Sequence, residues 1–126
     1  MTRQSTVLVI TGPRESPDRL DLPALGAPLV YATADTVSAQ EWYDALMVLV
    51  DDRHIASLLD KHLPPRGRGH VVAVYTDRDD PCVFRRAAAI GATEAAHAGD
   101  DLLKLHALTL VWTQQMQWEH VFGADA

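Results

Sequence analysis

The chain has 126 residues, of which 48% are hydrophobic and 22% are charged, and this balance suits one globular domain with a single core. Its formal net charge of −6 comes without an extended basic stripe, which argues against a nucleic-acid-binding protein. A single cysteine excludes an internal disulfide, and no apolar run approaches the about 20 residues that span a bilayer. We therefore expect one cytoplasmic domain over residues 1–126, with its core at about 5–120.

Two apolar strands and a short helix are predicted at the start of the chain. Residues 6–10 (TVLVI) are an uninterrupted apolar run, which is typical of a central strand in a parallel sheet. Ser16 and Pro17 open a helix, because serine caps helix starts and proline fits the first helical position. A second strand follows at residues 28–32, and its leading proline favours a place near the sheet edge.

A capping box marks the start of the next helix. Ser38 and Glu41 have the spacing at which each side chain binds a free backbone N–H group of the first helical turn. Val37 and Trp42 hold the flanking positions of a hydrophobic staple. The helix must be brief, because residues 45–50 (ALMVLV) form a third apolar strand.

Two carboxylates follow this third strand, and we interpret Asp52 as the cap of another helix. The apolar face of that helix would be formed by Ile55, Leu58, Leu59 and Leu63. Pro64 and Pro65 would then end it, because proline interrupts the helical hydrogen bonds.

A strand, an acidic turn and a capped helix make up the fourth unit. Residues 71–75 (VVAVY) form a strand that is covered on both faces. Asp80 then occupies the N-cap position of a helix, and Pro81 its first helical position. Gly91 supplies the left-handed residue that ends this helix.

A short fifth strand at residues 93–98 precedes a long final helix, which Asp100 caps and which runs from about 101 to 119. The alternation of strands and helices with short connections predicts an α/β fold, a three-layer α/β/α sandwich around a five-stranded parallel sheet. Apolar side chains surround the final helix instead of forming one stripe, so we expect a partner to cover its outer side. The anchors of that interface would be Leu105, Leu108, Trp112 and Met116.

The order and size of these units resemble the receiver domain of response regulators, which implies a flavodoxin-like (CheY-like) sheet with strand order 2-1-3-4-5. Four segments are more specifically similar to the amino-terminal receiver-like domain of actinobacterial septum-site-determining and CpaE/TadZ-like proteins. These segments are VLVITG at 7–12, TVSAQEW at 36–42, LMVLVDD at 46–52 and DDPCVFRRAAAIGA at 79–92. In that group the domain precedes a MinD/ParA-type ATPase and governs placement and partner contacts; this chain contains no GKT motif of its own.

The resemblance also implies where a phosphoacceptor site would lie. Receivers hold Mg²⁺ with two acids after the first strand, phosphorylate an acid after the third, and place a hydroxyl and a lysine after the fourth and fifth. In this chain the corresponding vestigial site would comprise Thr11, Asp51, Asp52, Thr76 and His97. Threonine and glycine replace the acid pair and histidine replaces the lysine, so the charge stabilisation of phosphoryl transfer is lost.

We therefore expect a pseudo-receiver that is not an enzyme, has no metal or cofactor, and acts as a protein-interaction, localisation or regulatory module. Its expected partners are a second copy, bound through the last helix, and an ATPase domain or partner of the MinD/ParA type. Two alternatives remain open: a phosphorylatable receiver that uses Asp51 or Asp52, and a flavodoxin-like binder of a small ligand at the strand ends. Arg85 and Arg86 are interpreted as a solvated helix face.

Overall fold

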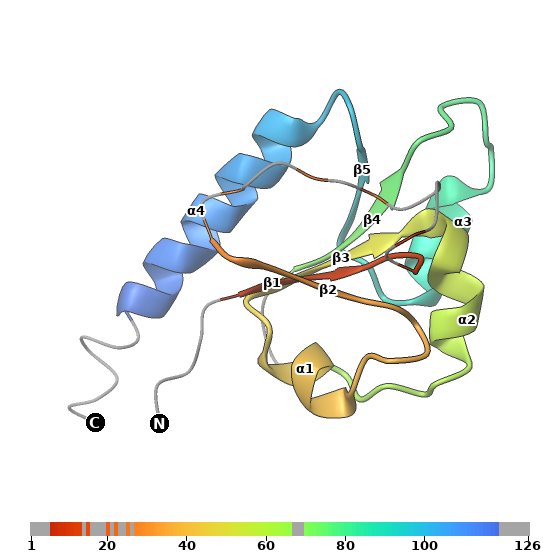
Figure 1. Cartoon of the computed structure of the whole chain (residues 1–126). Coiled ribbons are helices and arrows are strands. Elements are labelled where there is room, and N and C mark those ends of the chain that lie inside the picture. The colour runs from red at the N-terminus through yellow and green to blue at the C-terminus, as the bar shows by residue number, and fades with distance from the viewer. Residues whose placement is uncertain are drawn as a thin grey trace.

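The computed structural model describes residues 6–13, 15, 20, 22, 25, 27–66 and 70–118, and within them the chain forms one parallel sheet of order β2-β1-β3-β4-β5 (Figure 1). Its strands are β1 (Val7–Ile10), β2 (Leu29–Ala32), β3 (Met47–Asp51), β4 (Val71–Tyr75) and β5 (Glu94–His97). Its helices are α1 (Ala39–Asp44), the 3-10 turn η1 (Asp52–His54), α2 (Ile55–Leu59), α3 (Val83–Ala89) and α4 (Leu102–Trp118). The predicted strand order is therefore confirmed, with β2 at an edge.

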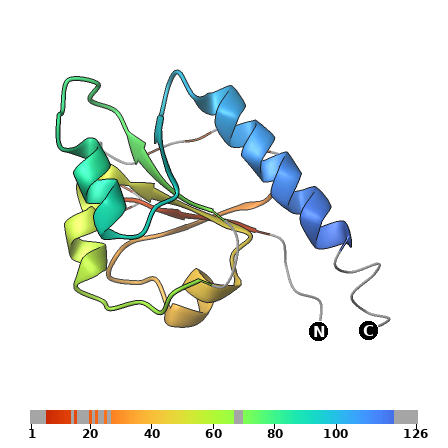
Figure 2. The same cartoon turned by 180° about the vertical axis from the view of Figure 1, so that it is seen from behind.

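Helices cover both faces of this sheet, as Figures 1 and 2 show from opposite sides. Successive strand residues point to opposite faces, so Leu8 and Ile10 pack with the residues of α1, α2 and α3, whereas Val7 and Val9 pack with α4. The central strands β1 and β3 are buried along their whole length. This explains their uninterrupted apolar sequences and confirms the three-layer sandwich. Among the described residues, no helix is both long enough and apolar enough to cross a membrane.

The capping box at the start of α1 is confirmed. The Ser38 hydroxyl accepts a hydrogen bond from the Glu41 N–H at 3.0 Å, and a Glu41 carboxylate oxygen accepts one from the Ser38 N–H at 2.9 Å. Trp42 and Val37 are both buried in the core under α1. The Trp42 indole donates to the carbonyl of Pro64 at 2.7 Å, so the ring also anchors the chain that follows α2.

Two helix boundaries differ clearly from those predicted. α3 begins at Val83 and not at Pro81, because Asp80 does not cap the helix: its carboxylate accepts from the Cys82 N–H at 2.9 Å and forms a tight turn ahead of the helix. α2 ends at Leu59, well before the prolines, and His62 then adopts a left-handed conformation with φ of 52°. Leu63 packs on the core from outside the helix.

α4 begins at Leu102, one residue after the predicted start, which leaves Asp100 outside the cap position. Gly91 adopts a φ of 70° and ends α3 as predicted. The helix expected from Ser16 onward lies largely outside the described residues.

The apolar residues of α4 divide between the core and the surface. Leu105 is fully buried against the sheet, so the prediction that it anchors an interface was wrong. Leu108 is partly buried against the same cluster, and its place in an interface stays a prediction. The outer side of α4 instead carries Leu103, Leu110 and Val111, with 86%, 42% and 58% of their surface exposed. The side chains of Trp112 and Met116 lie outside the described residues.

Candidate functional site

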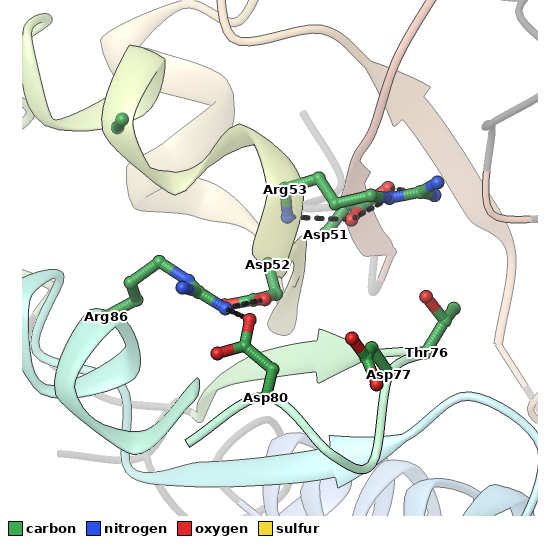
Figure 3. A pocket seen from close by; sticks show the side chains of 8 residues that line it. Asp51, Asp52, Arg53, Thr76, Asp77, Asp80 and Arg86 are labelled. Carbon is green, nitrogen blue, oxygen red and sulfur yellow. Dashed lines mark hydrogen bonds and ion pairs between the residues drawn. The ribbon is translucent and has the colours of Figure 1, made fainter. Parts of the chain in front are cut away.

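A pocket of about 420 Å³ opens where β3 and β4 end (Figure 3). The carboxyl ends of parallel strands lie at one edge of the sheet, and the pairing of Asp51 with Val74 places the ends of β3 and β4 side by side there. The pocket is lined by Asp51, Asp52, Arg53, Ala56, Thr76, Asp77, Asp80 and Arg86. It therefore contains the predicted acceptor and hydroxyl positions.

Asp51 is the last residue of β3, and Arg53 occupies both of its carboxylate oxygens. Asp51 is 1% exposed. One of its oxygens accepts from the Arg53 backbone N–H at 3.0 Å and from Nε at 3.1 Å, and the other accepts from Nη2 at 2.8 Å. Asp51 thus caps η1, the role that the sequence had suggested for Asp52. The two-pronged, charge-assisted geometry holds this carboxylate as an ion pair.

Asp52 is bound by Arg86 from α3. Nε of Arg86 donates to one Asp52 oxygen at 2.7 Å and Nη2 donates to the other at 2.5 Å, while Nη2 also pairs with Asp80. This cluster joins the end of β3, the loop before α3 and the helix α3 itself, as Figure 3 shows. Arg86 was predicted to lie on a solvated face, which is wrong, because its side chain is only 33% exposed and contacts two carboxylates.

Charge pairing shifts the pKa values of two groups in this cluster and keeps both groups ionised. The hydrogen bond from Arg86, together with the Cys82 N–H, lowers the pKa of the Asp80 carboxyl below its ordinary value. The carboxylates of Asp52 and Asp80 raise the pKa of Arg86 above its usual range. The guanidinium is therefore a permanent cation of the pocket.

Thr11, which follows β1, lies outside the pocket lining, and so does Glu15, the acid of the same loop. Ile10 pairs with Val50, so Thr11 stands level with Asp51 on the neighbouring strand, at the place that the resemblance assigns to the metal-binding acids. Its hydroxyl is buried and accepts a hydrogen bond from the Leu20 N–H at 3.0 Å. Glu15 is exposed. In the part of the chain that the structure describes, no group of three or more His, Cys, Asp or Glu side chains is placed to hold a metal ion.

His97 ends β5, and it also lies outside the lining of the pocket. Its Nε2 lies 3.2 Å from the backbone oxygen of Thr76, and its Nδ1 faces the turn that leads to α4. His97 is therefore tied to the neighbouring strand and turn. The pocket's cations among the described lining residues are Arg53 and Arg86.

The structure thus brings together three of the five predicted site residues, Asp51, Asp52 and Thr76, and adds two arginines and two further aspartates that the sequence interpretation missed. A signal for Arg86 was present, because it lies one helical turn after the buried Val83 and next to the buried Ala87. Arg53 follows Asp51 by two residues, a spacing that only the 3-10 turn makes favourable for pairing.

A comparison with known families identifies the chain. The family model described as "Rv3660c-like, CheY-like N-terminal domain" matches residues 18–108, well over half of the chain. The matched range contains three of the four segments on which the resemblance was based, and the whole lining of the pocket. Comparisons with curated proteins and with solved structures gave no match. With its strand order, pocket position and family match, the chain belongs to the Rv3660c-like, CheY-like N-terminal domain family.

Proposed function

We propose that this domain is a pseudo-receiver, a regulatory or localisation module that works through protein contacts and not through phosphoryl transfer. The observation that carries the proposal is the Asp51–Arg53 pair. An acceptor carboxylate must present an oxygen that is accessible to the phosphorus atom, in line with the leaving group, and that is not held by a strong cation. Both oxygens of Asp51 instead accept hydrogen bonds from Arg53, and 2% of its side chain is exposed.

The second acidic residue offers no better nucleophile. Asp52 is held through both oxygens by Arg86, and its side chain is 8% exposed. Attack from either carboxylate would require an arginine to withdraw and leave a largely buried charge unpaired, which is energetically costly. The threonine at position 11, where the resemblance places metal-binding acids, supports the same proposal.

Mass spectrometry of the intact chain after incubation with acetyl phosphate and Mg²⁺ tests this proposal. We expect no phosphate adduct on the wild type. The alternative, a phosphorylatable receiver, is favoured by the position of Asp51 at the end of β3 beside Thr76. It predicts an adduct that is lost in Asp51→Asn or Asp52→Asn and retained in Asp77→Asn, a matched control in the same pocket.

We further propose that the domain serves a septum-site or pilus-assembly ATPase system of the MinD/ParA type, as a partner or as an attached domain. Two observations support this: the four sequence segments that resemble such proteins, and the description of the matched family as an N-terminal domain. Co-purification of the chain with the candidate ATPase, compared with Leu103→Glu on α4 and the control Ser57→Glu on α2, tests it. The absence of any complex at high concentrations of both proteins would contradict it.

Self-association through α4 is the contact that we propose for the domain itself. The supporting observation is the exposed row of Leu103, Leu110 and Val111, which lie within one to two helical turns on the side away from the core. Light scattering over a concentration series should show a dimer that Leu103→Glu dissociates. The control Ser57→Glu adds the same charge at an exposed polar position of α2, on the opposite face of the sheet, and should leave the dimer intact. A wild-type chain that stays monomeric at high concentration would contradict the proposal.

A further inference from the structure

His97 closes the turn between β5 and α4 with both ring nitrogens and its backbone. Its Nδ1 lies 3.1 Å from the backbone nitrogen of Gly99 and 3.1 Å from that of Asp100. Its Nε2 lies 3.2 Å from the carbonyl oxygen of Thr76, and its own N–H donates to the Asp101 carboxylate at 2.8 Å. One residue therefore joins the end of β4 and the end of β5 to the turn that leads into α4.

These contacts select one protonation state of the ring. Two backbone N–H groups can both donate to Nδ1 only if that atom presents a lone pair. The ring proton must then be on Nε2, where it is donated to the carbonyl of Thr76. A second proton would place an N–H on Nδ1, directly facing the N–H groups of Gly99 and Asp100. The turn in this conformation accommodates only a neutral imidazole.

Charged groups around the turn give the protonated ring an alternative partner. The charged or titratable side chains on the elements that meet here are Tyr75, Arg78, Glu94, Asp100, Asp101 and Lys104. The carboxylate of Asp100 is the nearest to Nδ1, at 3.9 Å, which is beyond hydrogen-bond distance. An imidazolium could reach it only if the turn moved, and it would then compete with Arg78, which already pairs with Asp100.

We propose that His97 is a proton-sensitive latch: the neutral ring holds the β5–α4 turn closed, and protonation opens it. The proposal goes beyond a contact role for the domain, because it gives the fold a response to pH. Histidine is the side chain that exchanges a proton within about pH 5–8. Thr76 lines the pocket, and its carbonyl accepts from Nε2 in both protonation states of the ring, so opening would free the turn and leave the bond to Thr76 in place.

Ring-nitrogen NMR and amide hydrogen exchange on the chain test the latch. At about pH 7.5 we expect the spectrum of His97 to show the neutral form with its proton on Nε2. Between about pH 7.5 and about pH 5.5, exchange at Gly99 and Asp100, corrected for its intrinsic pH dependence, should accelerate about tenfold, as the loss of one or two neutral hydrogen bonds implies. In His97→Asn the amide oxygen can take the place of Nδ1 without titrating, so protection there should not depend on pH. His106→Asn, on α4, should keep the wild-type response.

Two results would overturn the proposal. One is a neutral His97 ring whose proton lies on Nδ1. The other is an equal pH dependence of exchange at Gly99 in the wild type and in His97→Asn. If His97→Asn does not fold, the ring spectrum and the pH dependence of exchange in the wild type test the proposal on their own, with His106→Asn as the reference.

Discussion

Replacing Arg86 with methionine would remove the guanidinium that binds Asp52 and Asp80 and keep most of the apolar length of the side chain. The side chain of Asp52 is 8% exposed, so its carboxylate would be left without a cation in a poorly solvated place. Removing one partner of a buried pair costs about 3–5 kcal/mol. Because a third of the Arg86 side chain is exposed, we reduce the expected loss of unfolding free energy to about 2 kcal/mol.

Thermal and urea unfolding measure this loss. We expect the melting temperature of Arg86→Met to fall by about 6–10 °C, and that of the control Arg85→Met, at an exposed position of the same helix, to change little. The double variant with Asp52→Asn should recover part of the loss, because it removes the unpaired charge. If Arg86→Met and Arg85→Met were equally stable, the Asp52–Arg86–Asp80 cluster would not hold α3 in the way described.

Four further variants test other parts of the structure by unfolding experiments. Ser38→Ala should lower the free energy of unfolding by about 1 kcal/mol through loss of the α1 cap. An unchanged free energy of unfolding would contradict the role of the capping box. Leu105→Ala should cost about 2–4 kcal/mol and Leu103→Ala less than about 0.5 kcal/mol, whereas equal costs would contradict their assignment to core and surface. The lowered pKa of Asp80 stabilises the fold above the ordinary aspartate pKa, and this stabilisation is lost as the pH falls through the lower folded value. The free energy of unfolding of the wild type should therefore exceed that of Asp80→Asn at neutral pH, and the two values should converge in acid. A difference in stability that does not depend on pH would contradict the pairing of Asp80 with Arg86.

The features that the sequence predicted well depend on neighbouring residues. The capping box needs only Ser38 and Glu41, which are three residues apart. The buried strands follow from uninterrupted apolar runs, and the position of β2 follows from its leading proline. Such local signals survive folding because no distant group competes for the same atoms.

The predictions that failed depend on groups that meet only after folding. Asp80 has the composition of a cap, yet its carboxylate serves a tight turn and Arg86, which shifts the start of α3 by two residues. Asp51 caps η1 in place of the predicted Asp52, because the 3-10 turn directs the Arg53 N–H toward Asp51 while α3 brings a cation to Asp52. Apolar residues around α4 gave no unique face, so the buried position of Leu105 could not be told from the exposed positions.

The central claim is that arginines occupy the carboxylates at the sheet edge and leave no phosphoacceptor. Titration of the isotope-labelled chain with beryllium fluoride and Mg²⁺, which together mimic an aspartyl phosphate, tests it most directly by NMR. The account predicts that the amide signals of Asp51, Arg53 and Thr76 stay unchanged. Saturable shifts of these signals that disappear in Asp51→Asn would contradict it.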